Sequence, residues 1–365
     1  MRLRSRVSRP FLLCLPLLAV PAASAQDAGT APQNKYGNFH VDLLGREEWT
    51  RDVPLDDGTT INESRWSIQG RPSYEYTAGA FDFGVGAAVN YSQDRNDESP
   101  LGAPILIIRD NYRSRDLRLD LAYGRLRLGP VTVQGGRFLM PLPLTEMIWD
   151  RDLRPQGGSL SLGFGSHTRF ALVGIYATGS HVFEDKSVTW GGGAQITLST
   201  GVSSGLQLAG SYLVFDKLDK LDPALGRQNS ILAGHYLYDY HVADATLRFS
   251  SGGSLTFVAD YCWNTALNAD NRGLWLAATF GSLANTAAQV DYTYARIDKD
   301  ATVAAFNTDD FYWATGWEGH RFEIGRATAK NSSAHAIAQW QRTLSNDSTT
   351  HPWILRWRLE WRSSF

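Results

Sequence analysis

The sequence lacks the features that mark disulfide-bonded proteins, helical membrane proteins and the common metal or nucleotide sites. It has two cysteines in 365 residues, Cys14 and Cys262. Beyond the first 25 residues no apolar run approaches the roughly 18 residues of a membrane helix, and apolar residues do not recur at helical spacing. No HExxH, CxxC, phosphate-loop or EF-hand spacing occurs. We therefore expect no cofactor, no metal site and no helical span.

The first 25 residues have the form of a secretory signal peptide. Four arginines precede an apolar run from Phe11 to Val20, and a small-residue A-x-A site ends at Ala25. We predict cleavage after Ala25, a short polar lead over residues 26–36, and one domain over residues 37–365. Cleavage leaves Cys262 as the single cysteine, which excludes an internal disulfide.

The charge of the mature chain is mildly negative. Removing four Arg from 35 basic residues leaves 31 against 37 acidic residues, a net charge of −6. This balance argues against nucleic acid as a partner.

The last thirteen residues, Trp353 to Phe365, alternate between apolar and charged side chains with the period of a β-strand. If the apolar face meets lipid, an Arg at Leu359 should cost ~2–4 kcal/mol, whereas Arg358→Ala on the other face should leave stability nearly unchanged. The apolar set contains Trp353, Leu355, Trp357, Leu359, Trp361 and Phe365, and the charged set contains Arg356, Arg358, Glu360 and Arg362.

The same alternation recurs along the whole mature chain, for example over 66–76, 81–91, 117–123 and 255–263. Short connections with Gly, Pro or Ser alternate with long connections rich in Asp and Lys. Seventeen segments can be counted, and we merge two of them over 309–328, where a bulge would explain a phase change between Trp317 and Phe322. The count becomes sixteen strands. A second phase change, between Val242 and Ala245, keeps fourteen and eighteen strands open.

These patterns predict an all-β fold, a transmembrane antiparallel up-and-down β-barrel. A closed barrel is the only structure besides a helix that satisfies every backbone polar group within lipid. Aromatic residues gather towards the strand ends, as expected of girdles at the two membrane interfaces, and the alternation of short and long connections is typical of outer-membrane barrels.

Two segments resemble known bacterial proteins. Residues 353–365 resemble the closing strand of outer-membrane barrels, which implies that Trp361 and Phe365 form part of a signal for the barrel-assembly machinery. Residues 149–155, Trp-Asp-Arg-Asp-Leu-Arg-Pro, resemble sequences in a group of porins of Gram-negative bacteria. This resemblance implies a barrel among the lipids of the outer membrane that passes small hydrophilic solutes by passive diffusion. The resemblance is compatible with a homotrimer but does not decide the oligomeric state.

The segment from Gly136 to Gly158 is the least strand-like, because it contains three prolines and a cluster of four charges. Two interpretations remain open: a loop folded into the lumen, where its charges would set the field at a constriction, or an outer loop with solvated charges. The candidate pore-lining or constriction residues are Arg118, Asp120, Arg137, Asp150, Arg151, Asp152, Arg154, Arg356, Arg358, Glu360 and Arg362. Their balance predicts a mild preference for anions.

Two other classes of function remain as alternatives to a porin. One is a secreted or periplasmic all-β binding protein with a soluble core. The other is an outer-membrane barrel enzyme, a lipase or protease, in which His235 and His241 with Asp239 and Asp244 would supply acid–base groups. No Ser/His/Asn or Asp/His arrangement of such an enzyme stands out, so we expect no catalytic residues.

Overall fold

The computed structural model describes residues 37–54, 60–92, 115–180, 185–201, 204–221, 226–308, 310–344 and 353–365. The predicted signal peptide with its cleavage site at Ala25 and the polar lead lie outside these residues. Within the part described, no helix has the length and apolar character needed to cross a membrane.

Sixteen antiparallel strands close into one barrel, which confirms the predicted fold class and strand number. A separate hairpin of β10 (Ile231–Leu232) and β11 (His235–Tyr236), preceded by the 3-10 helix η1 (Leu218–Lys220), lies in the connection after β9. The barrel strands are β1 (Asn38–Pro54), β2 (Thr60–Ala78), β3 (Phe81–Ser92), β4 (Asp116–Leu128), β5 (Val131–Arg137), β6 (Pro155–Phe164), β7 (Thr168–Ser180), β8 (Val188–Gly201), β9 (Ser204–Asp216), β12 (Tyr240–Ser251), β13 (Leu255–Asn264), β14 (Arg272–Ser282), β15 (Ala288–Ile297), β16 (Trp317–Ala329), β17 (Ser332–Thr343) and β18 (Ile354–Ser364).

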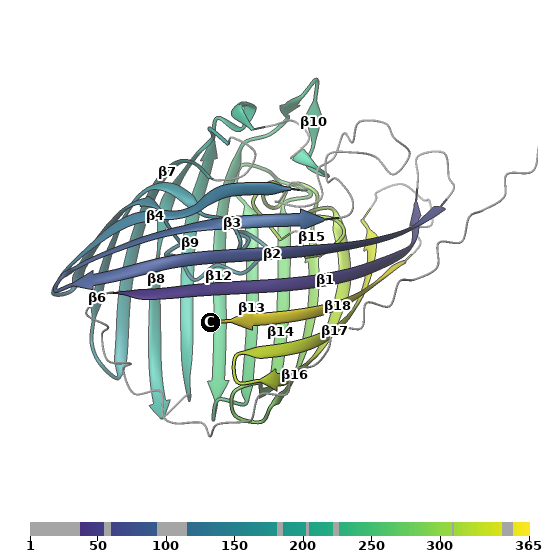
Figure 1. Cartoon of the computed structure of the whole chain (residues 1–365). Helices are drawn as coiled ribbons and strands as arrows, with labels where there is room; N and C mark the ends of the chain where they lie inside the picture. The colour runs from purple at the N-terminus through teal and green to yellow at the C-terminus, as the bar shows by residue number, and fades with distance from the viewer. Residues whose placement is uncertain are drawn as a thin grey trace, which may run out of the picture.

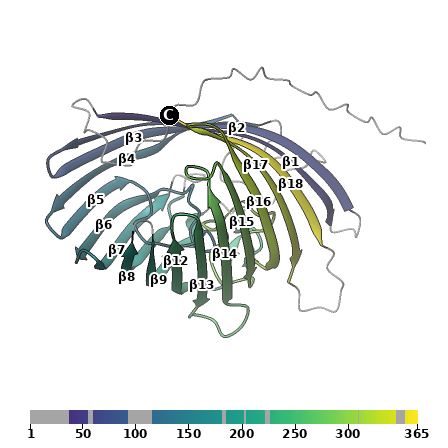
Figure 2. The ribbon, with the colours of Figure 1, turned by 90° about the horizontal axis from the view of Figure 1, so that it is seen from below.

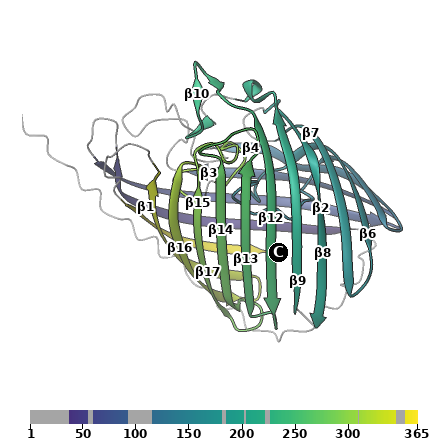
Figure 3. The same cartoon turned by 180° about the vertical axis from the view of Figure 1, so that it is seen from behind.

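Each strand pairs with its neighbour in sequence order, and β18 pairs with β1 to close the ring. Figure 1 shows β1, β2 and β18 crossing the near wall obliquely. Figure 2 shows the strands surrounding a common interior, and Figure 3 shows β8, β9, β12, β13 and β14 on the opposite wall. The strand bounds put the short turns at one end, for example between β4 and β5, and the long connections after β5, β9 and β15 at the other.

The outer wall of the barrel is apolar, as the alternation predicted. On β18, Trp357, Leu359 and Trp361 are 44–52% exposed, while Arg356, Arg358 and Glu360 point inward and are at most 5% exposed. The same division continues around the ring, where Val85, Leu172, Leu208, Phe257 and Ile324 are all exposed on the outside. A soluble protein would hide such a surface from water. The outer wall therefore suits lipid and disfavours the soluble binding protein.

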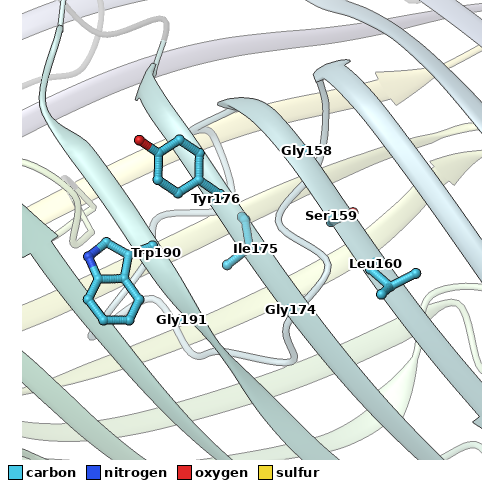
Figure 4. Close-up of a pocket in the computed structure, with 8 residues that line it drawn as sticks. All are labelled: Gly158, Ser159, Leu160, Gly174, Ile175, Tyr176, Trp190 and Gly191. Atoms are coloured by element: carbon cyan, nitrogen blue, oxygen red, sulfur yellow. The ribbon is translucent and has the colours of Figure 1, made fainter.

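A hollow of ≈ 690 Å³ interrupts the outer wall across β6, β7 and β8. Leu160 pairs with Gly174, and Gly174 pairs with Gly192, so two of the three neighbouring positions have no side chain. Figure 4 shows Tyr176 and Trp190 on adjacent strands beside this gap. The missing side chains therefore leave a hollow in the outer wall.

Both expected phase changes have a cause other than a bulge or a hidden turn. The registers of β12 and β16 run without a shift through Val242–Ala245 and Trp317–Phe322. Trp317 and Val242 are fully buried apolar residues that face inward, whereas Phe322 is exposed on the outside. The bulge predicted within 317–322 is wrong: the alternation fails there because the barrel has an apolar core inside it.

The predicted alternation over 117–123 also needs correction. A register shift between Gly86 and Ala87 of β3 brings Leu121 opposite Gly86 and Leu119 opposite Ala87. Leu119 is exposed outside, whereas Leu121 is buried. The bulge therefore reverses the alternation after Asp120, so that Leu121 and Tyr123 face inward while Leu126 and Leu128 are exposed outside.

Candidate functional site

Two long connections fold into the barrel and meet there. We call residues 138–154, between β5 and β6, the first inner loop, and residues 298–316, between β15 and β16, the second inner loop. The backbone N–H of Asp150 donates to the carbonyl oxygen of Phe306 at 2.7 Å, and that of Thr308 donates to Glu146 at 2.8 Å. Of the two interpretations of 136–158, the structure therefore has the loop inside the lumen.

The inner loops form an apolar core on one side of the lumen. Trp149 stacks on Phe306 with ring centroids 5.2 Å apart, and Phe306 stacks on Phe215 of β9 at 5.6 Å. In the second inner loop, Phe311 packs on Trp317 at 4.5 Å and on Trp275 of β14 at 5.7 Å. This packing fills much of the lumen beside β9, β12, β14 and β16 with apolar side chains.

Two glycines on the barrel wall leave room for the first inner loop. A side chain at Gly193 of β8 would place its Cβ 3.0 Å from Leu142, and one at Gly273 of β14 would meet Met147 at 2.6 Å. The sequence Gly191-Gly192-Gly193 therefore serves close packing. This agrees with its position within a strand with no following helix.

Charged side chains line the other side of the lumen, with Asp310 of the second inner loop at the centre. Its carboxylate contacts Arg358 at 2.8 Å, Arg46 at 3.0 Å, Arg151 at 3.1 Å and Arg321 at 3.2 Å. Burial raises the pKa of Asp310, but the four guanidinium groups outweigh this and hold its pKa well below the ordinary value. Asp310 therefore stays ionised and ties the second inner loop to β1, β16 and β18.

Glu48 of β1 forms a second centre beside Asp310. It contacts Arg65 at 2.9 Å and Arg358 at 2.6 Å, and it accepts a further hydrogen bond from Arg356. Arg356 also donates to the backbone carbonyl of Asp310 at 3.1 Å. Arg356 and Arg358 thus lie behind the second inner loop, covered from the open lumen.

A third set of carboxylates continues the charged side along β16 and β18. Glu360 contacts Arg46 at 2.7 Å and Arg362 at 2.6 Å. Glu323 contacts Arg321 at 2.6 Å and Arg362 at 2.9 Å. His335 lies between Glu323, at 2.7 Å, and the hydroxyl of Ser333, at 2.8 Å. Guanidinium and carboxylate groups therefore alternate along this wall.

The first inner loop is held by ion pairs to the wall near β2 and β4. Asp152 contacts Arg71 of β2 at 2.9 Å, and Arg154 contacts Asp120 of β4 at 3.4 Å. Burial raises the pKa of Asp152, but the charges of Arg71, Arg151 and Arg154 bring it below the ordinary value.

A cavity of ≈ 340 Å³ remains between the first inner loop and the wall formed by β18, β1 and β2. We call it the passage. Four guanidinium and three carboxylate groups line it, together with the polar side chains of Gln69, Ser363 and Ser364. The charged residues are Arg46, Arg71, Arg151, Arg362, Asp42, Asp152 and Glu360.

Four of the predicted constriction residues line the passage: Arg151, Asp152, Glu360 and Arg362. The others do not line it. Arg118 pairs with Asp116 at 3.5 Å, and Arg137 donates to Gln156 and to the carbonyl of Leu119, both at 2.7 Å. Asp150 is buried and accepts the N–H of Asp152 at 2.7 Å, so it shapes the loop.

Sequence reasoning missed Arg46, Glu48, Glu323 and Asp310. A signal existed in β1, where Arg46 and Glu48 are two residues apart and so share one face of a strand. Asp310 had no such signal, because its partners come from four separate segments of the chain.

The histidines proposed for a barrel enzyme do not share a strand. His235 lies in β11 of the separate hairpin, and His241 lies in β12. Among the residues that the structure describes, no group of three or more His, Cys, Asp or Glu side chains could hold a metal.

No protein-family model matches the chain, and no curated protein sequence matches it. Among solved structures, the high-pH structure of OprB from Pseudomonas putida has a TM-score of 0.59 and 12% sequence identity, covering 91% of this chain and 94% of OprB. A triple mutant of Rhodopseudomonas blastica porin covers 90% of this chain and all of its own, with 10% identity and a TM-score of 0.49. The likeness to OprB shows that this chain has a porin-like barrel fold.

Proposed function

We propose that this chain is a porin of the outer membrane of a Gram-negative bacterium and passes small hydrophilic solutes by diffusion, without catalysis. The passage beside the first inner loop carries this proposal, because it is polar, charged and surrounded by a barrel whose outside is apolar. Barrels of about 16 strands are wide enough for an aqueous channel. Conductance of the refolded protein in a planar bilayer tests the proposal, and absence of channels would reject it.

The passage supports a mild preference for anions. Its lining has four guanidinium groups against three carboxylates, and charges within a Debye length of about 8–10 Å act on a passing ion with little screening. Arg151 is the lining arginine most open to solvent, with a side chain 57% exposed against 10–30% for Arg46, Arg71 and Arg362. The lining has one positive charge more than negative charges. We therefore expect anions to pass more readily than cations, without exclusion of cations.

Under a KCl gradient, the wild-type reversal potential should lie towards the chloride equilibrium potential. Arg151→Gln should move it towards potassium, because the variant removes one positive charge from the passage. Arg127→Gln is the matched control, since Arg127 pairs with Asp82 at 2.6 Å on the lumen side but does not line the passage. A cation-selective wild type would reject the preference, and equal shifts in both variants would reject the passage as its origin.

We propose that Phe365 and Trp361 act as a signal for the barrel-assembly machinery. Both side chains are exposed, and the backbone of Phe365 pairs with Val41 of β1, with two N···O distances of 3.0 Å. Deleting Phe365 should lower the amount of heat-modifiable barrel in the outer membrane and increase periplasmic degradation. Trp340→Phe, a change to another exposed ring on the outside, is the control. Wild-type levels of the truncated protein in that fraction would count against the signal.

We also propose that the outer face of β18, β1 and β2 contacts further copies of the chain in a homotrimer. Glu47 supports this, because it is exposed on the outer face between Leu359 and Trp66 in the paired registers. A carboxylate among apolar residues facing lipid is unfavourable and often indicates a protein contact. Glu47→Lys should convert the oligomer to monomers in unheated gels and mass photometry in mild detergent. A monomeric wild type would exclude the trimer.

A further inference from the structure

Two arginines and one glutamate form a charged cluster on the outside of the barrel, at the end with the long connections. We call Arg296 of β15, Glu318 of β16 and Arg342 of β17 the rim cluster. The three residues lie opposite one another in the paired registers. Glu318 contacts Arg296 at 3.3 Å and Nε of Arg342 at 2.6 Å. The adjacent residues Ile297 and Trp317 are fully buried and face inward, so the rim cluster faces outward.

The rim cluster exposes its cations and covers its carboxylate. The side chains of Arg296 and Arg342 are 52% and 45% exposed, whereas that of Glu318 is 10% exposed. Asp298, a second carboxylate beside Arg296, lies 4.0 Å away, is 22% exposed and accepts the backbone N–H of Arg272 at 3.1 Å. In the part of the chain that the structure describes, Nη2 of Arg296 and Nη1 of Arg342 donate to no acceptor. Two guanidinium groups are therefore available to an anion from outside.

A row of aromatic rings lies next to the rim cluster, two residues nearer the middle of each strand. Tyr294, His320 and Trp340 are opposite one another in the same registers. The guanidinium carbon of Arg342 also lies over the ring of Trp353, 5.0 Å from the ring centroid. Aromatic girdles mark the two membrane interfaces of an outer-membrane barrel, and two strand residues span about 6–7 Å. The rim cluster is therefore at the depth of the lipid headgroups.

We propose that the rim cluster binds a phosphate group of a phosphorylated glycolipid, lipopolysaccharide, in the outer leaflet. This inference rests on the outer-membrane location in the proposed function. Guanidinium groups bind phosphate through charge-assisted hydrogen bonds, and basic residues beside a membrane attract anionic headgroups. Glu318 holds the two arginines side by side and so positions them for one phosphate. The acyl chains of the same lipid then lie on the apolar outer wall, where Phe322 and Trp357 are exposed.

Native mass spectrometry of the refolded barrel in an uncharged detergent measures lipid binding, with EDTA present so that no divalent cation bridges the charged groups. The two probes are phosphorylated lipid A and the same lipid A with its phosphates removed. We expect the phosphorylated lipid to bind at least about tenfold more tightly. Added NaCl should reduce this preference, because salt screens exposed charges. Inorganic phosphate should not displace the lipid, since it makes no contact with the apolar wall.

Three variants and a control identify the residues responsible. Arg296→Gln and Arg342→Gln should each lower the affinity for phosphorylated lipid A about fivefold and leave that for the dephosphorylated lipid unchanged. Either variant suffices if the other does not fold. Glu318→Gln should raise the affinity for phosphorylated lipid A, because it removes a negative charge and keeps an acceptor for Arg342. Arg115→Gln is the matched control, since Arg115 is exposed at the same end of the barrel, over the ring of Tyr91.

Equal affinities of the wild type for the two lipids, or equal losses in Arg296→Gln and Arg115→Gln, overturn the proposal. Displacement by inorganic phosphate also overturns it, because the rim cluster would then be a site for free phosphate. A change of oligomer mass in Arg342→Gln with unchanged lipid affinity would assign the cluster to a contact between copies of the chain. Conductance of the same preparation separates this inference from the pore. A conducting channel without phosphate preference rejects only the lipid site, whereas phosphate preference without conductance supports the lipid site and rejects the pore.

Discussion

Asp310→Asn should loosen the inner loops, lower stability by about 3–5 kcal/mol and make the channel more anion-selective. The variant keeps the size of the side chain but removes the carboxylate that contacts four arginines. Within the described residues, Arg358, whose side chain is 0% exposed, would keep a single ion pair, with Glu48. A buried charge without its partner is strongly destabilising.

Urea unfolding of the refolded barrel and the reversal potential measure the two effects. Asp291→Asn is the matched control, because Asp291 faces the lumen and accepts neutral donors, Thr279 at 2.6 Å and Gln289 at 2.8 Å. Equal losses of stability in the two variants would contradict the central role of Asp310.

The effect of pH on Asp310 has a definite sign. Its pKa in the folded protein is held well below the unfolded value of about 3.9. The contribution of Asp310 to stability is therefore fully present above about pH 4 and is lost as the pH falls through the lower folded-state value. Mild acid should leave the second inner loop in place.

Substitutions at the neighbouring residues Leu359 and Arg358 of β18 should both lower stability. Leu359 matters because it is on the apolar outer face, and Arg358 matters because it is buried among carboxylates inside. Leu359→Arg places a charge on the outer face and should cost ~2–4 kcal/mol in a lipid bilayer. Arg358→Ala should cost about 3–5 kcal/mol, because it leaves Glu48 and Asp310 buried beside one cation fewer. The sequence alone predicted that Arg358→Ala would leave stability nearly unchanged, because the lumen face was expected to be solvated. The buried ion pairs of Arg358 replace that prediction.

Unfolding free energies in lipid vesicles test both variants, and Arg362→Ala is the control for Arg358→Ala. Arg362 faces the same lumen but its side chain is 30% exposed, so its ion pairs should contribute about 0–1 kcal/mol. If Arg358→Ala and Arg362→Ala cost the same, the second inner loop does not cover the wall as described.

The sequence predicted the wall of the barrel far better than its interior. Each strand meets lipid on one face, so a local pattern of two residues reveals strands such as β3, β13 and β18. The interior depends on which loops fold inward. Trp317 and Val242 belong to the apolar core with those loops, so apolar side chains occupy inward positions where a water-filled lumen would have polar ones. Arg151, Asp152, Glu360 and Arg362, which line the passage, could be named from the sequence because charge on a lumen face or in a proline-rich loop is a local signal. Asp310 itself carries none, because its four partners come from β1, the first inner loop, β16 and β18.

The charged wall spans the junction at which the chain's first and last strands meet. Arg46 of β1 reaches Glu360 of β18 across 314 positions of sequence, and Glu48 reaches Arg358 across 310. Contacts between positions so far apart form late in folding, because the loop between them must first be closed. A barrel in which β1 and β18 have not yet paired would hold Arg46 without Glu360 and Arg358 without Glu48. One wall of its passage would be missing. The ion selectivity of a single channel therefore indicates whether β1 and β18 of that molecule have paired.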